Sequence, residues 1–256
     1  MTSIGNIEIQ DLFVGSNNAL GLYQGPVVVW EKSSPTANLL CFTAEEVNST
    51  VSMATNGTAP EVSLEYSTDG RTWSPFVVGT TTVTLANIGD KVYVRATSAG
   101  NTGMGTSTTA YNKFVMTGKI GASGNVDTLL DQNGNTTLTS YCYYSMFSGC
   151  SSLTTAPELP ATTLASNCYA NMFSGCSSLT IAPTLPATTI ADYCYYNMFK
   201  GCTSLTIAPT LPATTLASNC YASMFNACTG LTTATELPVT TLATRCYYNM
   251  FKGSNG

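Results

Sequence analysis

The second half of the chain is built from a 26-residue repeat, which limits what it can fold into more than any other feature. Four copies follow one another, each opening with a leucine: Leu153, Leu179, Leu205 and Leu231. A degenerate first copy occupies residues 127–152. A fixed period of this length predicts a solenoid of stacked coils, and five coils exceed the three or so that such an array needs.

Nine of the ten cysteines follow the same period in two series. The series are Cys142, Cys168, Cys194, Cys220, Cys246 and Cys150, Cys176, Cys202, Cys228. Zinc sites use close pairs such as C-x-x-C, usually with histidine, whereas these cysteines lie eight residues apart in a chain without histidine. We therefore expect reduced, buried core thiols and no metal site, since free cysteine packs as a small apolar side chain. A disulfide between adjacent coils is the alternative.

The last copy has Ser254 where the other copies have the second cysteine. A terminal coil lacks a neighbour on one side, so a polar residue there fits the end of a solenoid. We therefore expect the array to end at this coil.

Within each copy the hydrophobic pattern changes. Leu179 and Ile181 alternate as in a strand, and Pro183 then keeps that strand short. Leu164 and Met172 lie eight residues apart with Cys168 midway between them, which predicts a helix. Each coil is thus expected to hold a short strand and a short helix. The helix should end at a glycine, such as Gly175 in the second coil, in the left-handed conformation.

The Leu-Pro step, the Cys-Tyr-x-x-Met-Phe block and the following Cys-x-x-Leu resemble the BspA-like class of leucine-rich repeats. The resemblance covers roughly residues 127–256. It implies surface display and adhesion, and such repeats are found in proteins of gut bacteria and their phages. A repeat fold does not by itself define a function.

One repeat position alternates between tyrosine and alanine along the array. Its occupants are Tyr144, Ala170, Tyr196, Ala222 and Tyr248. On helices about 8–10 Å apart, the tyrosines would form an outward row spaced at roughly 20 Å. Such a row suits stacking on a sugar or a partner surface, so these tyrosines are the candidate ligand-binding or partner-binding residues. The alternative is that each tyrosine covers the alanine of the next coil.

Residues 37–121 have a different texture, and we expect an immunoglobulin-like β-sandwich there. Strand-like runs separated by turn residues cover 39–46, 62–66, 82–86, 91–98 and 112–118. Asp69-Gly70 predicts a hairpin, and Tyr66 and Trp73 are expected in the core. The stretch EYSTDGRTWSPF resembles fibronectin-type and other immunoglobulin-like modules, which implies a spacer.

Residues 1–36 form a separate N-terminal segment. Its paired strand, glycine-turn, strand pattern ends in Val27, Val28, Val29 and Trp30. The pattern resembles the N-terminal strands of phage tail and head appendage proteins. Such a short region cannot bury this surface alone, so we expect these four residues to attach the chain to a virion scaffold by strand addition. An ordinary hairpin of the sandwich is the alternative.

Composition excludes several classes of function. With 9% charged residues, a net charge of −5 and no cluster of basic residues, neither nucleic acid nor membrane insertion is expected. No export signal is visible at the start of the sequence. The common nucleophile, phosphate-binding and zinc motifs are absent, and without histidine the commonest general base is missing. The paired carboxylates that a glycosidase needs would have to come from Glu45, Glu46, Glu61, Glu65 or Asp69.

Together these features predict a multidomain, mainly β protein with an N-terminal segment (1–36), an immunoglobulin-like sandwich (37–121) and a leucine-rich repeat solenoid (122–256). We expect no catalysis, cofactor or metal, and a structural and binding role in a phage virion assembled in the host cytoplasm. Expected partners are other virion proteins, further copies of the chain, and a host surface glycan or protein. A bacterial surface adhesin is the alternative, and a polysaccharide depolymerase is a third.

Overall fold

The computed structural model describes residues 2–4, 7–9, 19–24, 27–32, 36, 38–134, 137–237, 239 and 241–255; up to residue 32 it describes the backbone only. The chain divides into two compact parts, Met1–Asn38 and Leu39–Gly256. The first division thus falls two residues after the expected one at 36. The boundary expected near residue 122 lies inside the second part. Strands from before and after this residue belong to the same sheet, so the sheet crosses the expected boundary.

The described residues are mainly β, with almost no helix. The N-terminal part holds β1 (Thr2–Ile4), β2 (Ile7–Ile9), β3 (Ala19–Gln24) and β4 (Val27–Lys32). The second part holds β5 (Leu40–Ala44), β6 (Ser49–Asn56), β7 (Leu64–Ser67), β8 (Ser74–Pro75), β9 (Thr82–Leu85), β10 (Lys91–Ala96), β11 (Gly105–Ser107), β12 (Ala110–Thr117), β13 (Ile120–Ser123), the 3-10 helix η1 (Val126–Leu129) and β14 (Leu153–Thr155). No described helix is long and apolar enough to span a bilayer.

Residues 39–123, here called the sheet region, supply all the strands of two sheets except β14, which comes from the coils. One has the strand order β14-β13-β5-β10-β7-β8, and the other has the order β11-β12-β6-β9. Alternate residues of β6 and β10 are buried, as expected for strands that cover a core with one face. The rings of Phe42 on β5 and Phe114 on β12 meet edge-on at 4.8 Å, so the two sheets share one core.

The strand predictions in this region are confirmed, with additions. Each of the five expected runs overlaps a strand, whereas the long strand β6 was not predicted. The hairpin at Asp69-Gly70 is confirmed, since β7 and β8 pair on either side of it. The expectation that Trp73 is a core residue is wrong: Trp73 is half-buried, with the Arg95 guanidinium 3.7 Å from its ring centre.

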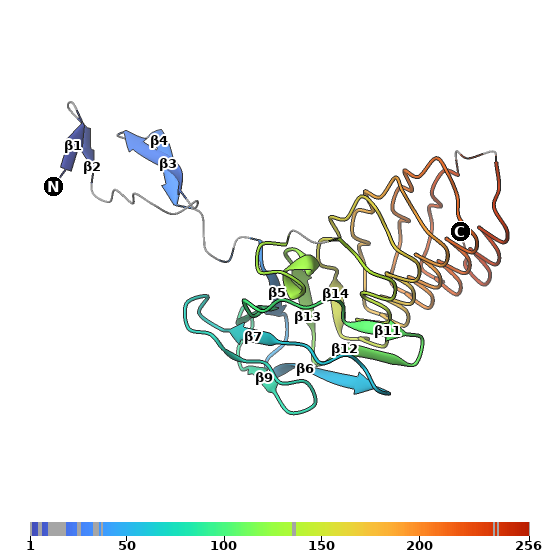
Figure 1. Ribbon diagram of the computed structural model, residues 1–256, viewed down its shortest axis with the longest axis horizontal. Coiled ribbons are helices and arrows are strands. Elements are labelled where there is room, and N and C mark those ends of the chain that lie inside the picture. Colours follow the sequence, from blue (N-terminus) through green and yellow to red (C-terminus); the bar gives the residue numbers. More distant parts are fainter. Residues whose placement is uncertain are drawn as a thin grey trace. The chain divides into compact units, whose positions relative to one another are not determined.

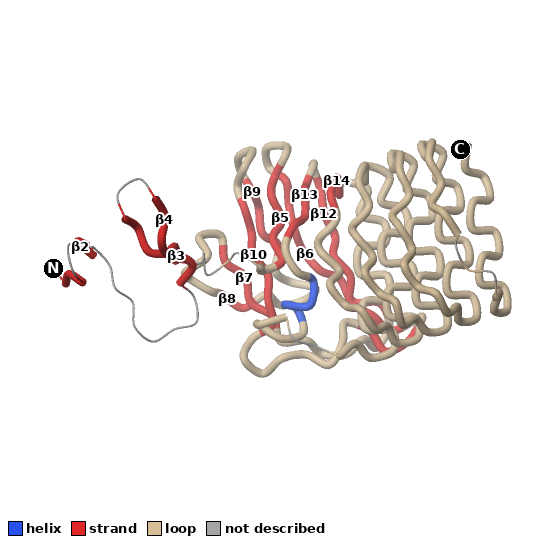
Figure 2. The backbone as a smooth tube through the Cα atoms, turned by 90° about the horizontal axis from the view of Figure 1, so that it is seen from above, coloured by secondary structure: helices blue, strands red, loops and turns tan. Residues whose placement is uncertain are grey.

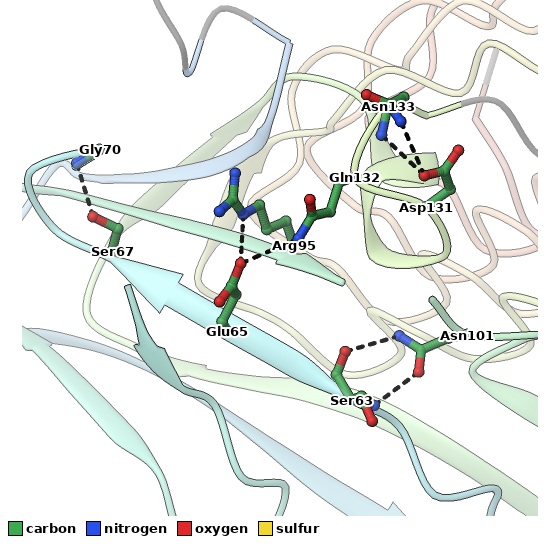
Figure 3. Close-up of polar contacts among 9 residues, drawn as sticks. All are labelled: Ser63, Glu65, Ser67, Gly70, Arg95, Asn101, Asp131, Gln132 and Asn133. Atoms are coloured by element: carbon green, nitrogen blue, oxygen red, sulfur yellow. Dashed lines mark hydrogen bonds and ion pairs between the residues drawn. The ribbon is translucent and has the colours of Figure 1, made fainter. Parts of the chain in front are cut away.

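A polar network ties the sheet region to the segment that opens the first coil (Figure 3). The Glu65 carboxylate accepts hydrogen bonds from Arg95 at 2.8 Å and from Gln132 at 3.4 Å. The Asn101 side chain exchanges hydrogen bonds with the backbone of Ser63 and also donates to the Leu129 carbonyl at 2.7 Å. These contacts fix the start of the repeats against β7.

The predicted helices of the coils are wrong. Where the structure describes them, the coils run as turns with only short strand pairing between them, and η1 is the one helix of the described residues (Figure 2). In place of each helix lies a ten-residue turn segment, in which neighbouring pairs of side chains are buried every four residues. The turn segments are Tyr141–Cys150, Asn167–Cys176, Tyr193–Cys202, Asn219–Cys228 and Arg245–Ser254.

Successive coils lie side by side (Figure 1). A ladder of backbone hydrogen bonds joins their turn segments. In coils 1 to 4, five alternate N–H groups per segment donate to carbonyls 25 residues further on, as from Tyr143 to Cys168 and from Phe147 to Met172, both at 2.9 Å. The N–H groups between them donate three residues back, as from Met146 to Tyr143. The backbone therefore joins coil to coil as strands do, although the chain itself turns.

The turn is produced by a residue in the left-handed conformation at every fourth position. The fifteen such residues have φ between 51° and 80°. Gly149, Gly175, Gly201 and Gly253 hold the last of the three left-handed positions in their coils, and Ala227 holds it in coil 4. The glycine prediction is thus confirmed for conformation, although no helix ends there. A four-residue period is close enough to 3.6 to imitate a helix in the sequence.

Inside the coils, identical side chains form ladders parallel to the array axis. Tyrosine rings at one position and phenylalanine rings at another stack at centroid distances of 5.4–6.0 Å from coil to coil. The tyrosines are 143, 169, 195, 221 and 247, and the phenylalanines are 147, 173, 199, 225 and 251.

The second cysteine series contributes hydrogen bonds between coils. The thiols of Cys176, Cys202 and Cys228 donate to phenylalanine carbonyls of the preceding coil at 2.9–3.1 Å. Ser254 makes the equivalent bond to Phe225 at 2.7 Å. The serine therefore preserves the contact of the cysteine it replaces, which explains its presence there without reference to the end of the array.

The sheet region continues this pattern at the first coil. Phe114 stacks on Phe147 at 5.2 Å, and its N–H donates to the Met146 carbonyl at 2.8 Å. The Phe114 carbonyl accepts the Cys150 thiol at 3.2 Å, the bond that Phe147 makes with the next coil. Strand β12 thus acts as an additional rung that covers the first coil.

In the N-terminal part, two antiparallel hairpins are present. Strand β1 pairs with β2, and β3 pairs with β4. Val27, Val28, Val29 and Trp30 lie on β4, but their side chains are outside the described residues. Within the described residues β3 and β4 form a sheet of their own, separate from both sheets of the sheet region.

Candidate binding surface on the turn segments

The three tyrosines singled out in the sequence lie on the outer side of the turn segments. Tyr144 and Tyr196 are half-buried, whereas Tyr248 is 58% exposed. Ala170 and Ala222, at the same repeat position, are fully buried. Larger neighbours therefore cover the alanines.

The tyrosine row has a second member in each odd-numbered coil. The ring centres of Tyr141 and Tyr144 are 5.9 Å apart, and those of Tyr193 and Tyr196 are 5.6 Å apart. In coil 5 the guanidinium of Arg245 lies 5.8 Å from the ring centre of Tyr248. These three pairs define what we call the aromatic-pair face.

The sheet region adds one residue to the aromatic-pair face. Tyr111 of β12 meets Tyr144 edge-on at 5.2 Å. In the even-numbered coils, the positions of the two pair members hold Asn167 with Ala170, and Asn219 with Ala222. Aromatic ridges therefore alternate with low amide-lined rows.

The first member of each pair is held in an unfavourable backbone conformation. Tyr141, Tyr193 and Arg245 have φ of 60°, 58° and 51°. Bulky residues rarely adopt this region, whereas asparagine does so readily, and such a conformation costs on the order of 1 kcal/mol or more. Asparagine holds the position in coils 2 and 4, so the array tolerates the better residue and nevertheless carries tyrosine or arginine in the odd coils.

The spacing of the tyrosine row differs from the sequence-based expectation of roughly 20 Å. The stacked rings show that coils are 5.4–6.0 Å apart, because backbone hydrogen bonds join them instead of helix packing. Tyrosines on alternate coils therefore recur at about twice that spacing.

Tyr144 also packs against the next coil. Burial raises the pKa of its hydroxyl, an effect reinforced by Tyr111 and opposed by hydrogen bonds with Ser145 and with Asn171 of coil 2. This contact supports the covering role for Tyr144. Tyr193 and Tyr248 are exposed side chains, at 39% and 58%, whereas Tyr144 is half-buried.

Uncharged polar groups line the same face. The Asn197 side-chain amide donates to that of Asn171 at 3.1 Å, so amides align from coil to coil. Asp192 accepts a hydrogen bond from the Ser218 backbone at 2.8 Å, and the Lys200 side chain is exposed in the same coil. Coil 3 therefore carries one exposed charge of each sign.

The prediction of buried cysteines is confirmed: all ten are buried and free. Burial raises the pKa of the Cys142 and Cys150 thiols to about 12. No cluster of three metal-ligating side chains occurs among the described residues. These thiols serve packing.

Three of the carboxylates considered for a glycosidase have structural partners. Glu45 accepts a hydrogen bond from the Thr154 hydroxyl at 2.9 Å. Glu65 is paired with Arg95. Asp69 accepts hydrogen bonds from the Arg71 and Thr72 backbone, which hold the pKa of its carboxyl well below the usual range. Asp69 therefore holds the turn between β7 and β8 in shape, and Glu65 joins β7 to β10. The face described above lies on a different part of the chain.

The search for known proteins gave no help with this surface. No protein-family model, curated protein or solved structure matches the chain. Its function is therefore inferred from the geometry of its own residues.

Sequence reasoning missed the first members of the pairs, Tyr141, Tyr193 and Arg245. A signal for them was present: Tyr, Asn, Tyr, Asn and Arg recur three residues before the Tyr/Ala position. The alternation becomes informative only once the position is known to be left-handed.

Proposed function

We propose that the chain is a structural and binding protein of a phage virion, in which a leucine-rich repeat solenoid displays the aromatic-pair face to a host surface. The observation that carries the proposal is the set of strained residues Tyr141, Tyr193 and Arg245. Each sits where asparagine would fold more easily, and unfavourable backbone conformations of this kind are concentrated at functional sites.

The stacked coils support the display role. Backbone ladders and ring stacks give every coil the same geometry, so side chains on one face recur at fixed intervals. Repeat arrays commonly use such regular faces for binding. The sheet region, proposed to be an immunoglobulin-like spacer, covers the first coil through Phe114.

Attachment to the virion is proposed for the N-terminal part. It is a separate compact part of the chain, and β4 carries Val27, Val28, Val29 and Trp30. Deletion of residues 1–34 should leave a soluble, folded fragment that no longer enters virions. Incorporation of that fragment at normal copy number would contradict the attachment role, and so would its unfolding.

A bacterial surface adhesin is the second candidate, because the aromatic-pair face would serve adhesion equally well. Mass spectrometry of purified virions separates the two. Detection of the chain at a fixed copy number supports the virion protein, and recovery from bacterial envelopes alone supports the adhesin.

The binding role has its own test. Replacing Tyr144, Tyr196 and Tyr248 together with alanine should weaken adsorption of the chain to host cells. Because Tyr144 packs on Tyr111, some loss of stability is expected from that residue alone. Unchanged adsorption by a destabilised triple variant would show that the tyrosines only pack.

A further inference from the structure

The aromatic-pair face has features that select among classes of ligand. Peptide strands bind by pairing with free N–H and C=O groups at a sheet edge. In coils 1 to 4, alternate N–H groups of the turn segments are instead committed to the next coil, and those between them bond within their own coil. Strand addition along coils 1 to 4 of this face is therefore unavailable.

Charge does not select the ligand either. The coil that carries the central pair, Tyr193 and Tyr196, has one anionic and one cationic side chain, Asp192 and Lys200. Recognition of phosphate or other strongly anionic groups relies on clusters of arginine. The central pair has no such cluster among the described residues.

What the face offers is aromatic rings and side-chain amides. Tyrosine rings supply rigid apolar surfaces with a polar end. Asn171 and Asn197, joined by a hydrogen bond, supply donors and acceptors beside them. A ligand that combines apolar ring faces with many hydroxyl groups can pack on the tyrosine rings and form hydrogen bonds with the asparagine amides.

The ridges also repeat along the array axis. Pairs recur on every second coil, and neighbouring coils are 5.4–6.0 Å apart. A linear polymer of rings lying along the axis can contact several ridges at once, and each additional contact multiplies affinity through effective concentration.

We propose that the aromatic-pair face binds an extended, neutral polysaccharide chain laid along the repeat axis, with its sugar rings on the tyrosine pairs. This inference rests on the proposed binding function and names its ligand class. Affinity should increase with chain length, by 10-fold or more from a short oligosaccharide that covers one ridge to a polymer that covers two or three.

The first experiment uses the full chain in native gels that contain hydroxyethyl cellulose, galactomannan, yeast mannan or dextran. At least one polymer should retard the chain, and added sodium chloride should not abolish the retardation. The double variant Tyr193→Ala, Tyr196→Ala should bind at least 10-fold more weakly.

The matched control changes two exposed side chains of neighbouring coils outside the face. Ile181 and Ile207 are 66% and 62% exposed and precede the turn segments. Ile181→Ala with Ile207→Ala should bind as the unaltered chain does. Equal loss in both double variants would overturn the proposal, as would retardation by none of the polymers.

A second experiment separates the ligand class from the binding function. Adsorption of the chain to a panel of intact bacterial cells is measured before and after periodate oxidation of the cells. Adsorption lost on oxidation supports a glycan. If adsorption survives oxidation, or if a proline-rich peptide competes with the cells for the chain, the glycan is not the ligand. The proposed binding function is not contradicted by either result. Adsorption to none of the cells contradicts both.

Discussion

The sheet region and the coils form comparable backbone ladders by different means. In the sheet region, strands of up to eight residues run extended, with side chains alternating between the two faces. In the turn segments the chain reverses every four residues, yet alternate N–H groups still reach the neighbouring coil at 2.7–3.1 Å. Ladder pairing therefore requires only that donors and acceptors project alternately along the array, and not that the chain be extended.

The two regions also differ in what they require of the sequence. Extended strands accept most side chains, whereas each turn segment needs three residues in the left-handed conformation. Where asparagine or glycine fills these positions, the requirement is met at low energy. Tyr141, Tyr193 and Arg245 depart from it with bulky side chains, whereas Ser145, Ser223 and Ala227 depart from it with small ones. The three bulky residues are the ones that we propose serve the surface.

The largest expected difference between the regions is in alkaline stability. Nine of the ten cysteines lie in the coils, and burial raises the pKa of Cys142 and Cys150 from 9.0 to about 12. Because the folded pKa is the higher one, their contribution to stability is present below pH 9 and is lost as the pH rises toward 12. The free energy of unfolding should fall by up to about 1.4 kcal/mol per pH unit for each such thiol.

Urea unfolding at pH 7, 9, 10 and 11 measures this loss. In a Trp30→Phe variant the single remaining tryptophan, Trp73, reports on the sheet region, while circular dichroism reports on the whole chain. A free energy of unfolding that stays constant up to pH 11 would contradict burial of the thiols.

The second prediction concerns the junction of the two regions. Phe114 packs on Phe42 within the sheet region and on Phe147 of the first coil. Phe114→Ala should therefore cost about 3–5 kcal/mol, and both regions should be destabilised together. Trp73 fluorescence and circular dichroism should show one shared transition. Loss of stability in the sheet region alone would show that it does not support the repeats.

The third prediction compares the two cysteine series. Cys202→Ser should be nearly neutral, because a hydroxyl can donate to the Phe173 carbonyl as Ser254 donates to Phe225. Cys194→Ser should cost about 1–3 kcal/mol, because Cys194 is a fully buried core residue. Cys41→Ser, in the sheet region, should cost less than Cys194→Ser. Thermal melting of the three variants gives the order, and equal losses in the two coil variants would contradict it.

Much of the fold could be predicted from periodicity, but its local geometry could not. A hydrophobic pattern that repeats every two residues indicates a strand and little else, so the runs around Phe42 and Val94 were correctly assigned as strands. The spacing of Leu164, Cys168 and Met172 fits both a helix and a turn that repeats every four residues. Asn167, Asn171 and Gly175 distinguish them, since all three favour the left-handed region and two asparagines one turn apart weaken a helix.

The candidate site was predictable in part for the same reason. The alternation of Tyr144, Ala170 and Tyr196 is visible in the sequence and located one row of the face. Its partner row could not be recognised, because the cost of placing Tyr193 at its position is a property of the backbone and not of the residue pattern. The coil spacing likewise depended on how the backbones pair.

The smallest expected effect is also the one that bears on the central claim, that tyrosine is kept at a left-handed position for binding. Tyr193→Asn introduces the residue that coils 2 and 4 carry there. The measurement is thermal melting together with adsorption to intact bacterial cells, on the same preparation. The variant should melt about 2 °C or more above the unaltered chain, since strain of about 1 kcal/mol is relieved, and it should adsorb more weakly. A lower melting temperature with unchanged adsorption would show that Tyr193 serves the fold, which would contradict the account.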